Sequence, residues 1–188
     1  MSRLGEELAG GGVVALPTET FYALAADPTS ERGVSRIFEL KGRDDGKPLL
    51  VLFSSRPQLE ALGVAAHPDL VDRLFRLWPA PLTAVLPLRA PIAASRGSVT
   101  LGVRMPAAPA VRELLDAVGP LTGTSANRAG APPLAEPDAI AAALGADLDV
   151  LIDGGPAPGG EPSTIVDATI EPPRLLRAGA FPWRDVTH

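Results

Sequence analysis

Four short stretches carry the side chains that could do chemistry in this sequence. Each places hydroxyl, amide or cationic groups beside an apolar run, where a rigid scaffold can present them to a ligand. They are residues 17–24 (PTETFYAL), 41–49, 125–127 (SAN), and 161–167 together with 177–179. Groups of these types bind anions and polar ligands through charge and hydrogen bonds.

Residues with nucleophilic character are scarce. The chain has no cysteine, which excludes thiolate catalysis, disulfides and cysteine-bound metals. Of the two histidines, His67 precedes Pro68 at an expected helix start, where it would cap the helix or face solvent, and His188 is the last residue of the sequence. Ser125 lacks a suitable histidine base and a G-x-S-x-G context, so it is a poor candidate nucleophile.

Two loop patterns also fail as ligand motifs. Asp147, Asp149 and Asp153 are spaced loosely as in a calcium loop, but the apolar residues 150–152 between them predict a strand, and no glutamate stands at the twelfth position. Residues 154–163 are rich in glycine but lack the G-K-[ST] ending of a P-loop. We therefore expect no dedicated metal site built by the protein.

The stretch 41–49 concentrates positive charge. Lys41, Arg43 and Lys47 lie within seven residues, in a chain that has only two lysines. Arginine binds phosphate oxygens bidentately and lysine acts as a point charge, so the cluster could grip a polyphosphate. Alternatively, these cations stabilise a helix C-terminus, with Asp44 and Asp45 neutralising them. We expect the loss of Lys41 or Arg43 to cost less than about 1 kcal/mol of stability, as for a cation without a packing role.

The other stretches allow two interpretations each. The threonines and glutamate of 17–24 could face a ligand or form a threonine-rich turn. The serine and asparagine of 125–127 follow an apolar run, where α/β proteins place ligands, but both residue types also cap helices and turns. The serine of 161–167 and the arginine of 177–179 could bind a ligand, or could be a strand start and a surface arginine.

The elements that would position these groups are short strands and amphipathic helices. Helical periodicity and caps indicate the helices, and apolar runs bounded by glycine or proline indicate the strands. The expected helices are 2–10, 30–41, 68–78, 108–118 and 137–144, and the expected strands are 13–16, 49–53, 82–88, 99–103, 121–124, 150–152, 164–168 and 175–176. Because the alternation is not strict, we expect one α/β domain over residues 1–188, with a mixed parallel and antiparallel sheet flanked by helices.

Composition narrows the class of function. The chain has 188 residues, of which 46% are hydrophobic and 21% charged, and its formal net charge is −5. This charge argues against general electrostatic binding of nucleic acid, so tRNA should bind at most weakly. No apolar run approaches the length of a membrane span, and the first residues lack the apolar core of a signal peptide. We therefore expect a cytoplasmic protein that does not bind membranes.

Taken together and in order, these stretches resemble the YrdC-like family, the threonylcarbamoyl-AMP synthases. The matching elements run from about residue 11 to 179. They are PTET-x-Y at 17–22, K-x-R at 41–43, KPL at 47–49, WP-x-PLT at 78–83, VRMP at 103–106, SAN at 125–127, PSTIVD at 162–167 and R-x-G at 177–179. One element alone would be weak evidence, but eight in the family's order are specific.

This resemblance implies a fold and a reaction. The fold is a twisted, mixed α/β sheet around a positively charged cavity, and the chain is similar to the short, single-domain form of the family. The reaction makes L-threonylcarbamoyladenylate and pyrophosphate from L-threonine, bicarbonate or CO2, and ATP, for threonylcarbamoyladenosine in tRNA. Other proteins transfer the group to tRNA. Mg²⁺ would arrive with the ATP phosphates, without a dedicated protein site.

The resemblance also implies which residues form the site. Lys41 and Arg43 would be the catalytic residues. The nucleotide would be contacted by Lys41, Arg43, Lys47, Thr100, Ser125, Asn127 and Arg177. L-Threonine would be held by Thr20, Leu52, Arg104, Gly123 and Ser163, with Arg104 on its carboxylate. Because the threonine amine and then its carbamate attack, such a site must position anionic reactants rather than supply a nucleophile.

Two positions depart from the family pattern. Ala23 and Ala80 stand where the family usually has glycine, and alanine would cost about 1 kcal/mol if either backbone needed a positive φ. Two other functions are weighed against the synthase: an RNA-binding YrdC-like module, and a carbamoyl- or adenylyl-transferring relative with a different acceptor. The negative net charge counts against the first. The K-x-R and S-x-N elements favour the synthase over the second.

Overall fold

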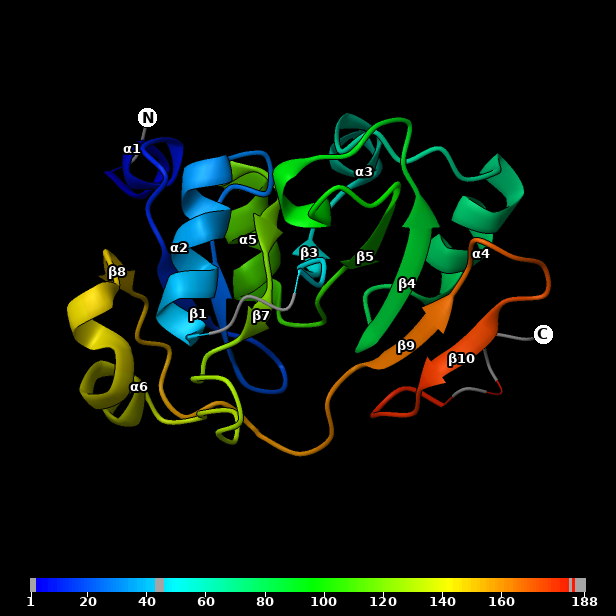
Figure 1. Cartoon of the computed structure of the whole chain (residues 1–188). Helices are drawn as coiled ribbons and strands as arrows, with labels where there is room; N and C mark the ends of the chain where they lie inside the picture. Colours follow the sequence, from blue (N-terminus) through cyan, green and yellow to red (C-terminus); the bar gives the residue numbers. More distant parts are fainter. Residues whose placement is uncertain (1–2, 43–45, 183, 185–188) are drawn as a thin grey trace.

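The strands of this protein form two mixed sheets (Figure 1). The computed structural model describes residues 3–42, 46–182 and 184. The four-stranded sheet has the order β7 (Thr124–Ser125), β2 (Tyr22–Ala25), β1 (Val14–Pro17) and β8 (Val150–Leu151). The six-stranded sheet has the order β10 (Arg174–Arg177), β9 (Thr164–Asp167), β4 (Leu82–Pro87), β5 (Thr100–Arg104), β3 (Val51–Leu52) and β6 (Leu121–Thr122). The predicted α/β class with mixed sheets is confirmed.

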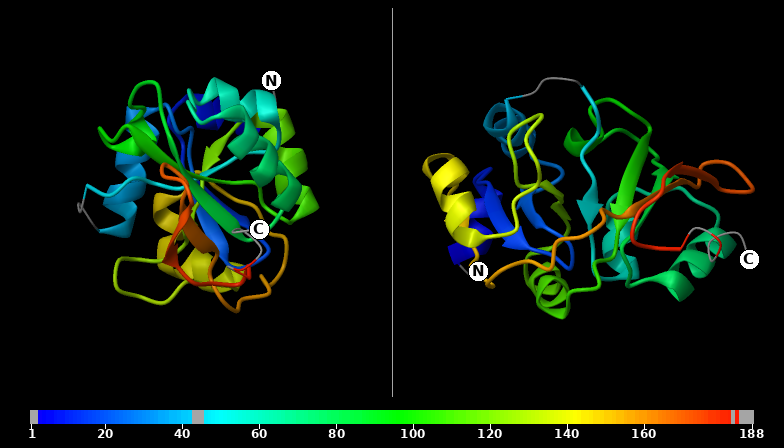
Figure 2. Two further views of the ribbon diagram at one scale, coloured as in Figure 1. Left: turned by 90° about the vertical axis from the view of Figure 1, so that its right-hand side faces the viewer. Right: turned by 90° about the horizontal axis from the view of Figure 1, so that it is seen from below.

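Helices cover both faces of the four-stranded sheet. The helices are α1 (Arg3–Ala9), α2 (Glu31–Lys41), α3 (Arg56–Ala61), α4 (Pro68–Leu77), α5 (Pro109–Val118) and α6 (Pro137–Leu144). Side chains alternate between faces along a strand. Val14 and Leu16 therefore pack with α1 and α5, whereas Ala15 joins the core that contains α2 and α6 residues. The right view in Figure 2 shows α6 (yellow) at one end of the molecule and the β9–β10 segment (orange to red) towards the other.

Local sequence signals fix the ends of α2. The Ser30 side chain accepts a hydrogen bond from the Gly33 N–H, as an N-cap does. Gly42 ends the helix with φ at +63°, a left-handed conformation that glycine adopts without steric cost. The predicted helix over 30–41 is thereby confirmed, and Lys41 becomes its last residue.

The two sheets meet at the segment that carries β6 and β7. Ala26 and Thr122 exchange hydrogen bonds of 2.9 Å: the Ala26 N–H donates to Thr122 Oγ1, and the Thr122 N–H donates to Ala26 O. The next residue, Gly123, donates its N–H to Leu50 O at 2.8 Å. A Cβ at Gly123 would lie 2.6 Å from Leu52 Cγ, so glycine allows this close crossing.

The structure differs from the expected elements in a few places. It adds β2 and α3, shortens the expected strand 49–53 to β3, and interrupts the expected strand 121–124 at Gly123. Strand β2 is not among the expected strands because its apolar run is not directly bounded by glycine or proline, the signal that marks the others. Among the described non-glycine residues, only Arg96 has a positive φ, so Ala23 and Ala80 impose no backbone strain.

Candidate functional site

A cavity of about 430 Å³ opens where the two sheets meet, within the usual range for ligand sites. The four-stranded sheet contributes the β1–β2 turn, β2 and β7, and the six-stranded sheet contributes β4, β5, β9 and β10. The polar side chains that line it are Thr18, Thr20, Tyr22, Thr83, Arg104, Thr124, Ser125, Ser163 and Arg177. Among the described lining residues, the charged ones are both arginines.

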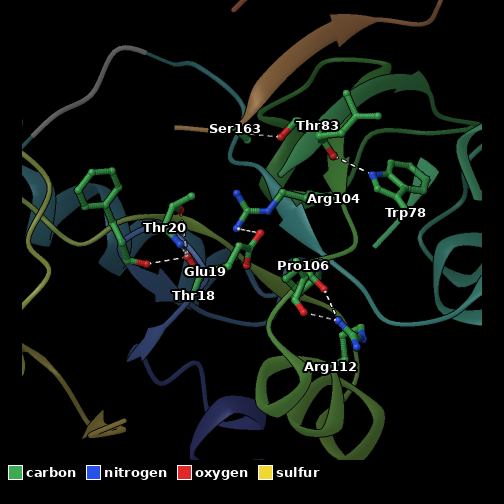
Figure 3. Close-up of polar contacts among 12 residues, drawn as sticks. Thr18, Glu19, Thr20, Trp78, Thr83, Arg104, Pro106, Arg112 and Ser163 are labelled. Atoms are coloured by element: carbon green, nitrogen blue, oxygen red, sulfur yellow. Dashed lines mark hydrogen bonds and ion pairs between the residues drawn. The ribbon is translucent and has the colours of Figure 1, made fainter. Parts of the chain in front are cut away.

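The turn between β1 and β2 presents hydroxyl groups to this cavity. Thr18 Oγ1 donates to Phe21 O at 2.7 Å and accepts from the Thr20 N–H at 3.2 Å. The hydroxyls of Thr18 and Thr20 lie 3.2 Å apart, and both residues are buried. The stretch 17–24 is therefore a threonine-rich turn, and it also lines the cavity (Figure 3).

Arg104 ends β5 and reaches across to this turn (Figure 3). It is only 5% exposed, and its Nη2 lies 3.4 Å from Oε1 of Glu19. Burial lowers the pKa of Arg104, the Glu19 carboxylate opposes this effect, and the positive charge of Arg177 adds to it. An arginine remains protonated at neutral pH even so, and this one carries buried charge at the cavity wall.

Ser163 and Arg177 also line the cavity. Ser163 Oγ lies 2.9 Å from Thr83 Oγ1. Arg177 donates to the Ser163 carbonyl from Nη2 at 2.8 Å and from Nε at 3.2 Å, and to Ser163 Oγ from Nη2 at 3.3 Å. Partial burial lowers the pKa of Arg177. The C-terminal strand β10 therefore contributes a cation to the same cavity as β5.

Lys41 lies behind Ser125 rather than in the lining. Its side chain is buried, and Nζ donates to Ser125 O at 2.6 Å, Asn127 O at 3.0 Å and Asn127 Oδ1 at 3.1 Å. The expectation that Lys41 lacks a packing role is therefore wrong. A lysine ammonium has three protons, and these three bonds tie the end of α2 to the loop after β7.

Asn127 completes the same network. Its Oδ1 also accepts from Ser125 Oγ at 2.6 Å, and its Nδ2 donates to Arg128 O at 3.0 Å and to Ala131 O at 2.6 Å. An amide side chain has two donors and two acceptor lone pairs, so its capacity is filled. Asn127 therefore holds the loop in shape, and it fixes Ser125, which lines the cavity.

The remaining predicted residues lie in different places. Lys47 is exposed, next to the cavity-lining residues 48–50, whereas Arg43 falls outside the described residues. Thr100 begins β5, about 13 Å of strand away from Arg104, and its hydroxyl lies 2.9 Å from Ser98 Oγ. Leu52 is fully buried in the core, against Gly123, and does not line the cavity.

The structure therefore brings together residues from distant stretches. Six of the predicted site residues line one cavity: Thr20, Arg104, Gly123, Ser125, Ser163 and Arg177. The sequence offered Glu19 as a ligand-facing group only as one of two alternatives, and it gave no role to Thr83 or Tyr22. The Tyr22 hydroxyl donates to Gly155 O at 2.8 Å and accepts from the Gly154 N–H at 3.2 Å, which pins the 154–160 loop beside the turn. Glu19 and Tyr22 stand inside the PTET-x-Y element, which could have marked them.

His67 and Asp149, which the sequence analysis rejected as catalytic or metal-binding residues, make structural hydrogen bonds. His67 is exposed, and its Nδ1 accepts from the Asp69 N–H at the start of α4. Asp149 accepts from the Val13 N–H at 2.7 Å and from Arg36 Nη1 at 2.6 Å. Partial burial raises the pKa of Asp149, but these hydrogen bonds lower it more, leaving it below its ordinary value. This carboxylate joins Val13, the residue before β1, to α2.

Neither a metal cluster nor a membrane helix is found in the described parts of the chain. Within residues 3–42, 46–182 and 184, no group of three or more His, Asp or Glu side chains is placed to hold a metal ion. No helix in the same ranges has the length and apolar character needed to cross a bilayer. The chemistry available at the cavity is anion binding by two arginines and hydrogen bonding by hydroxyls.

Comparison with known proteins places this cavity in context. Residues 6–179 match the model of the Sua5/YciO/YrdC family, described as "Telomere recombination". The chain is 37% identical to the threonylcarbamoyl-AMP synthase of Pyrococcus abyssi, over 94% of its own length and 53% of that protein. It is 36% identical to the threonylcarbamoyl-AMP synthase of Thiobacillus denitrificans, over 89% of each chain.

A solved structure shows the same similarity at the level of the fold. The crystal structure of P. abyssi Sua5 in complex with L-threonine superposes with a TM-score of 0.89 at 35% identity, over 97% of this chain and 55% of that one. This chain thus spans about half the length of the archaeal protein. The eight sequence elements, the two-sheet fold and the match over residues 6–179 agree, and the chain belongs to the Sua5/YciO/YrdC family.

Proposed function

We propose that this chain makes L-threonylcarbamoyladenylate and pyrophosphate from L-threonine, bicarbonate or CO2, and ATP. One observation carries the proposal: Thr20, Arg104, Gly123 and Ser163 come from four distant stretches and line one cavity. The names of the relatives and the threonine complex of P. abyssi Sua5 support the same activity. The proposal places the reaction in the cytoplasm, with tRNA threonylcarbamoyl-transfer proteins acting on the product.

At the amino-acid end, Arg104 would bind the threonine carboxylate. A guanidinium binds a carboxylate through two parallel charge-assisted hydrogen bonds, and these are stronger in a buried site than in water. The hydroxyls of Thr20 and Ser163 lie in the same lining and would supply neutral hydrogen bonds. Gly123 contributes its backbone to the same lining.

The reaction requires positioning rather than a protein nucleophile. The neutral threonine amine attacks the carbon of CO2, forming an N–C bond and releasing a proton to solvent. A carbamate oxygen then attacks the α-phosphorus of ATP, and the bond from that phosphorus to the bridging oxygen of pyrophosphate breaks. Both reactants are anionic, so Arg104 and Arg177 would offset their repulsion and hold them in line.

At the nucleotide end, the exposed Lys47 and the lining residues Ser125 and Arg177 would contact ATP. Lys41 and Asn127 would act by holding Ser125 in place. Arg43 belongs to the same predicted phosphate grip but lies outside the described residues. Mg²⁺ bound to the ATP phosphates would neutralise the leaving pyrophosphate.

Pyrophosphate release tests this function. The purified chain is incubated with ATP and Mg²⁺, with L-threonine and bicarbonate each present or omitted. We expect release only when both are present. Serine should be a poorer substrate, because a pocket fitted to the methyl group of threonine gains about 1–3 kcal/mol from it. AMP formation that ignores threonine would instead indicate a different acceptor.

A further inference from the structure

The carboxylate of Glu19 is buried, but the turn that carries it supplies no hydrogen bond to it. Its side chain is 16% exposed, yet both carboxylate oxygens are inaccessible and lack a hydrogen-bond partner within the described part of the chain. The neighbouring hydroxyls are engaged elsewhere: Thr18 Oγ1 donates to Phe21 O and lies beside Thr20 Oγ1. A buried carboxylate without hydrogen bonds is costly, so a nearby positive charge has to offset it.

That charge is Arg104. Its Nη2 lies 3.4 Å from Glu19 Oε1, and its Nε is also buried without a hydrogen-bond partner among the described residues. Arg104 comes from the six-stranded sheet and Glu19 from a turn of the four-stranded sheet, so the ion pair crosses the junction between the sheets (Figure 3). Among the described residues, the negative charge of Glu19 attracts Arg104, and the positive charge of Arg177 repels it.

Arg104 and Glu19 are placed differently with respect to the cavity. Arg104 lines it, whereas Glu19 does not, and its oxygens are sealed from solvent. The carboxylate therefore lies behind the guanidinium and cannot touch a ligand without moving. A carboxylate in this place restrains the guanidinium from one side, while Arg104 itself still lines the cavity.

We propose that Glu19 is a positioning residue for amino-acid binding, acting through Arg104. It fixes the orientation of the guanidinium and offsets its charge while the cavity is empty, so that the carboxylate of an α-amino acid meets a preformed partner. This inference rests on the proposed function, since it names the residue that prepares the amino-acid end of that same site.

The test compares Glu19→Gln with a matched control. Glutamine keeps the size of the side chain but removes its charge, so the buried guanidinium turns towards other acceptors. We expect the Kd for L-threonine, measured by calorimetric titration, to rise about tenfold, with the Kd for a non-hydrolysable ATP analogue changing less than about twofold. Glu171→Gln breaks a similar pair with Arg73 on the exposed surface and should change neither Kd.

A double variant distinguishes a positioning role of Glu19 from a purely structural one. In an Arg104→Met background, Glu19→Gln should leave the already weakened threonine Kd within about twofold. It should also raise the melting temperature above that of Arg104→Met alone, because it removes an unpaired buried carboxylate. If Glu19 merely joined the sheets, Glu19→Gln would lower the melting temperature and leave the threonine Kd of the folded protein unchanged.

These experiments distinguish a failure of the proposed function from a failure of the role inferred for Glu19. A wild-type chain that binds no L-threonine overturns both the function and this inference. A wild-type chain that binds threonine, with Glu19→Gln binding equally well or more tightly, overturns only the role of Glu19. Tighter binding would mean that Glu19 competes with the ligand for Arg104. An equal loss of threonine and nucleotide affinity in Glu19→Gln would also contradict the proposed role of Glu19.

Discussion

At the Arg104 side of the cavity, buried charged groups keep unused hydrogen-bonding capacity, whereas at the Ser125 side the buried polar groups are bonded within the protein. The Nε of Arg104 and both oxygens of Glu19 have no hydrogen-bond partner in the described structure. By contrast, Lys41 Nζ makes three hydrogen bonds and the side-chain amide of Asn127 makes four.

This difference separates binding groups from supporting ones. An unsatisfied buried donor costs free energy in the empty protein and recovers it when a ligand accepts its hydrogen bond. A satisfied group has nothing to gain from a ligand unless it first breaks a bond inside the protein. Arg104 lines the cavity and is therefore suited to bind a ligand directly, whereas the Lys41 network lies outside the lining and is suited to hold Ser125 in place.

The largest effect should come from Arg104→Ala. It removes a charge-assisted bidentate contact, a class of hydrogen bond worth about 1.5–3 kcal/mol, so threonine affinity should fall about ten- to a hundredfold. Binding of an ATP analogue should change little. Calorimetric titrations with each ligand check this, and unchanged threonine binding would show that Arg104 does not hold the amino acid.

Lys41→Met should act mainly on stability. Methionine keeps most of the side-chain volume but cannot donate, so the bonds to Ser125 and Asn127 are lost. Hydrogen bonds to charged groups contribute about 1.5–3 kcal/mol, and we expect the free energy of unfolding to fall by about 2 kcal/mol. Urea denaturation measures this. A variant of wild-type stability that no longer binds nucleotide would instead make Lys41 a direct ligand contact.

Ser163→Ala should have a smaller effect on threonine affinity. Its hydroxyl is neutral, and such hydrogen bonds contribute about 0.5–1.5 kcal/mol, which corresponds to a loss of about two- to tenfold. Thr83→Ser provides the control, because it keeps the hydroxyl that lies 2.9 Å from Ser163 Oγ. If Ser163→Ala weakened threonine binding as much as Arg104→Ala, the division between charged and neutral contacts would be wrong.

The sequence predicts the parts of this molecule that depend on local signals. The Ser30 cap, the stripe of Val34 and Ile37 and the Gly42 stop define α2, and similar signals define α4 and α6. Strand β2 carries no such signal. The crossing of Gly123 over Leu52 is a long-range contact, which no local pattern encodes.

In the candidate site, too, some features could be predicted from the sequence and others depend on long-range contacts. The resemblance named six of the residues that line the cavity, because the family's elements preserve their order in the sequence. It could not tell that Lys41 is buried while Lys47 is exposed, since burial depends on how α2 packs against the loop after β7. The pairing of Glu19 with Arg104 joins residues 85 positions apart and is visible only in three dimensions.

The two lysines allow the sharpest comparison, because they are of one residue type, six positions apart, in opposite environments. Lys47 is exposed, and surface substitutions away from packed features change stability by less than about 0.5 kcal/mol. We expect Lys47→Met to shift the urea midpoint far less than Lys41→Met does. Its effect should appear instead in ATP-analogue binding, where an exposed charge contact is worth about 0.2–1 kcal/mol.

Salt distinguishes the two contributions. Exposed charges are screened within about 8–10 Å at physiological ionic strength, whereas buried pairs are screened much less. The difference in nucleotide affinity between wild type and Lys47→Met, up to about fivefold in dilute buffer, should therefore shrink as sodium chloride is added. The stability deficit of Lys41→Met should persist at the same salt concentrations. If instead the Lys47 effect were insensitive to salt, Lys47 would have to be enclosed with the phosphates when ATP binds, and the nucleotide side would then change shape more than the amino-acid side does.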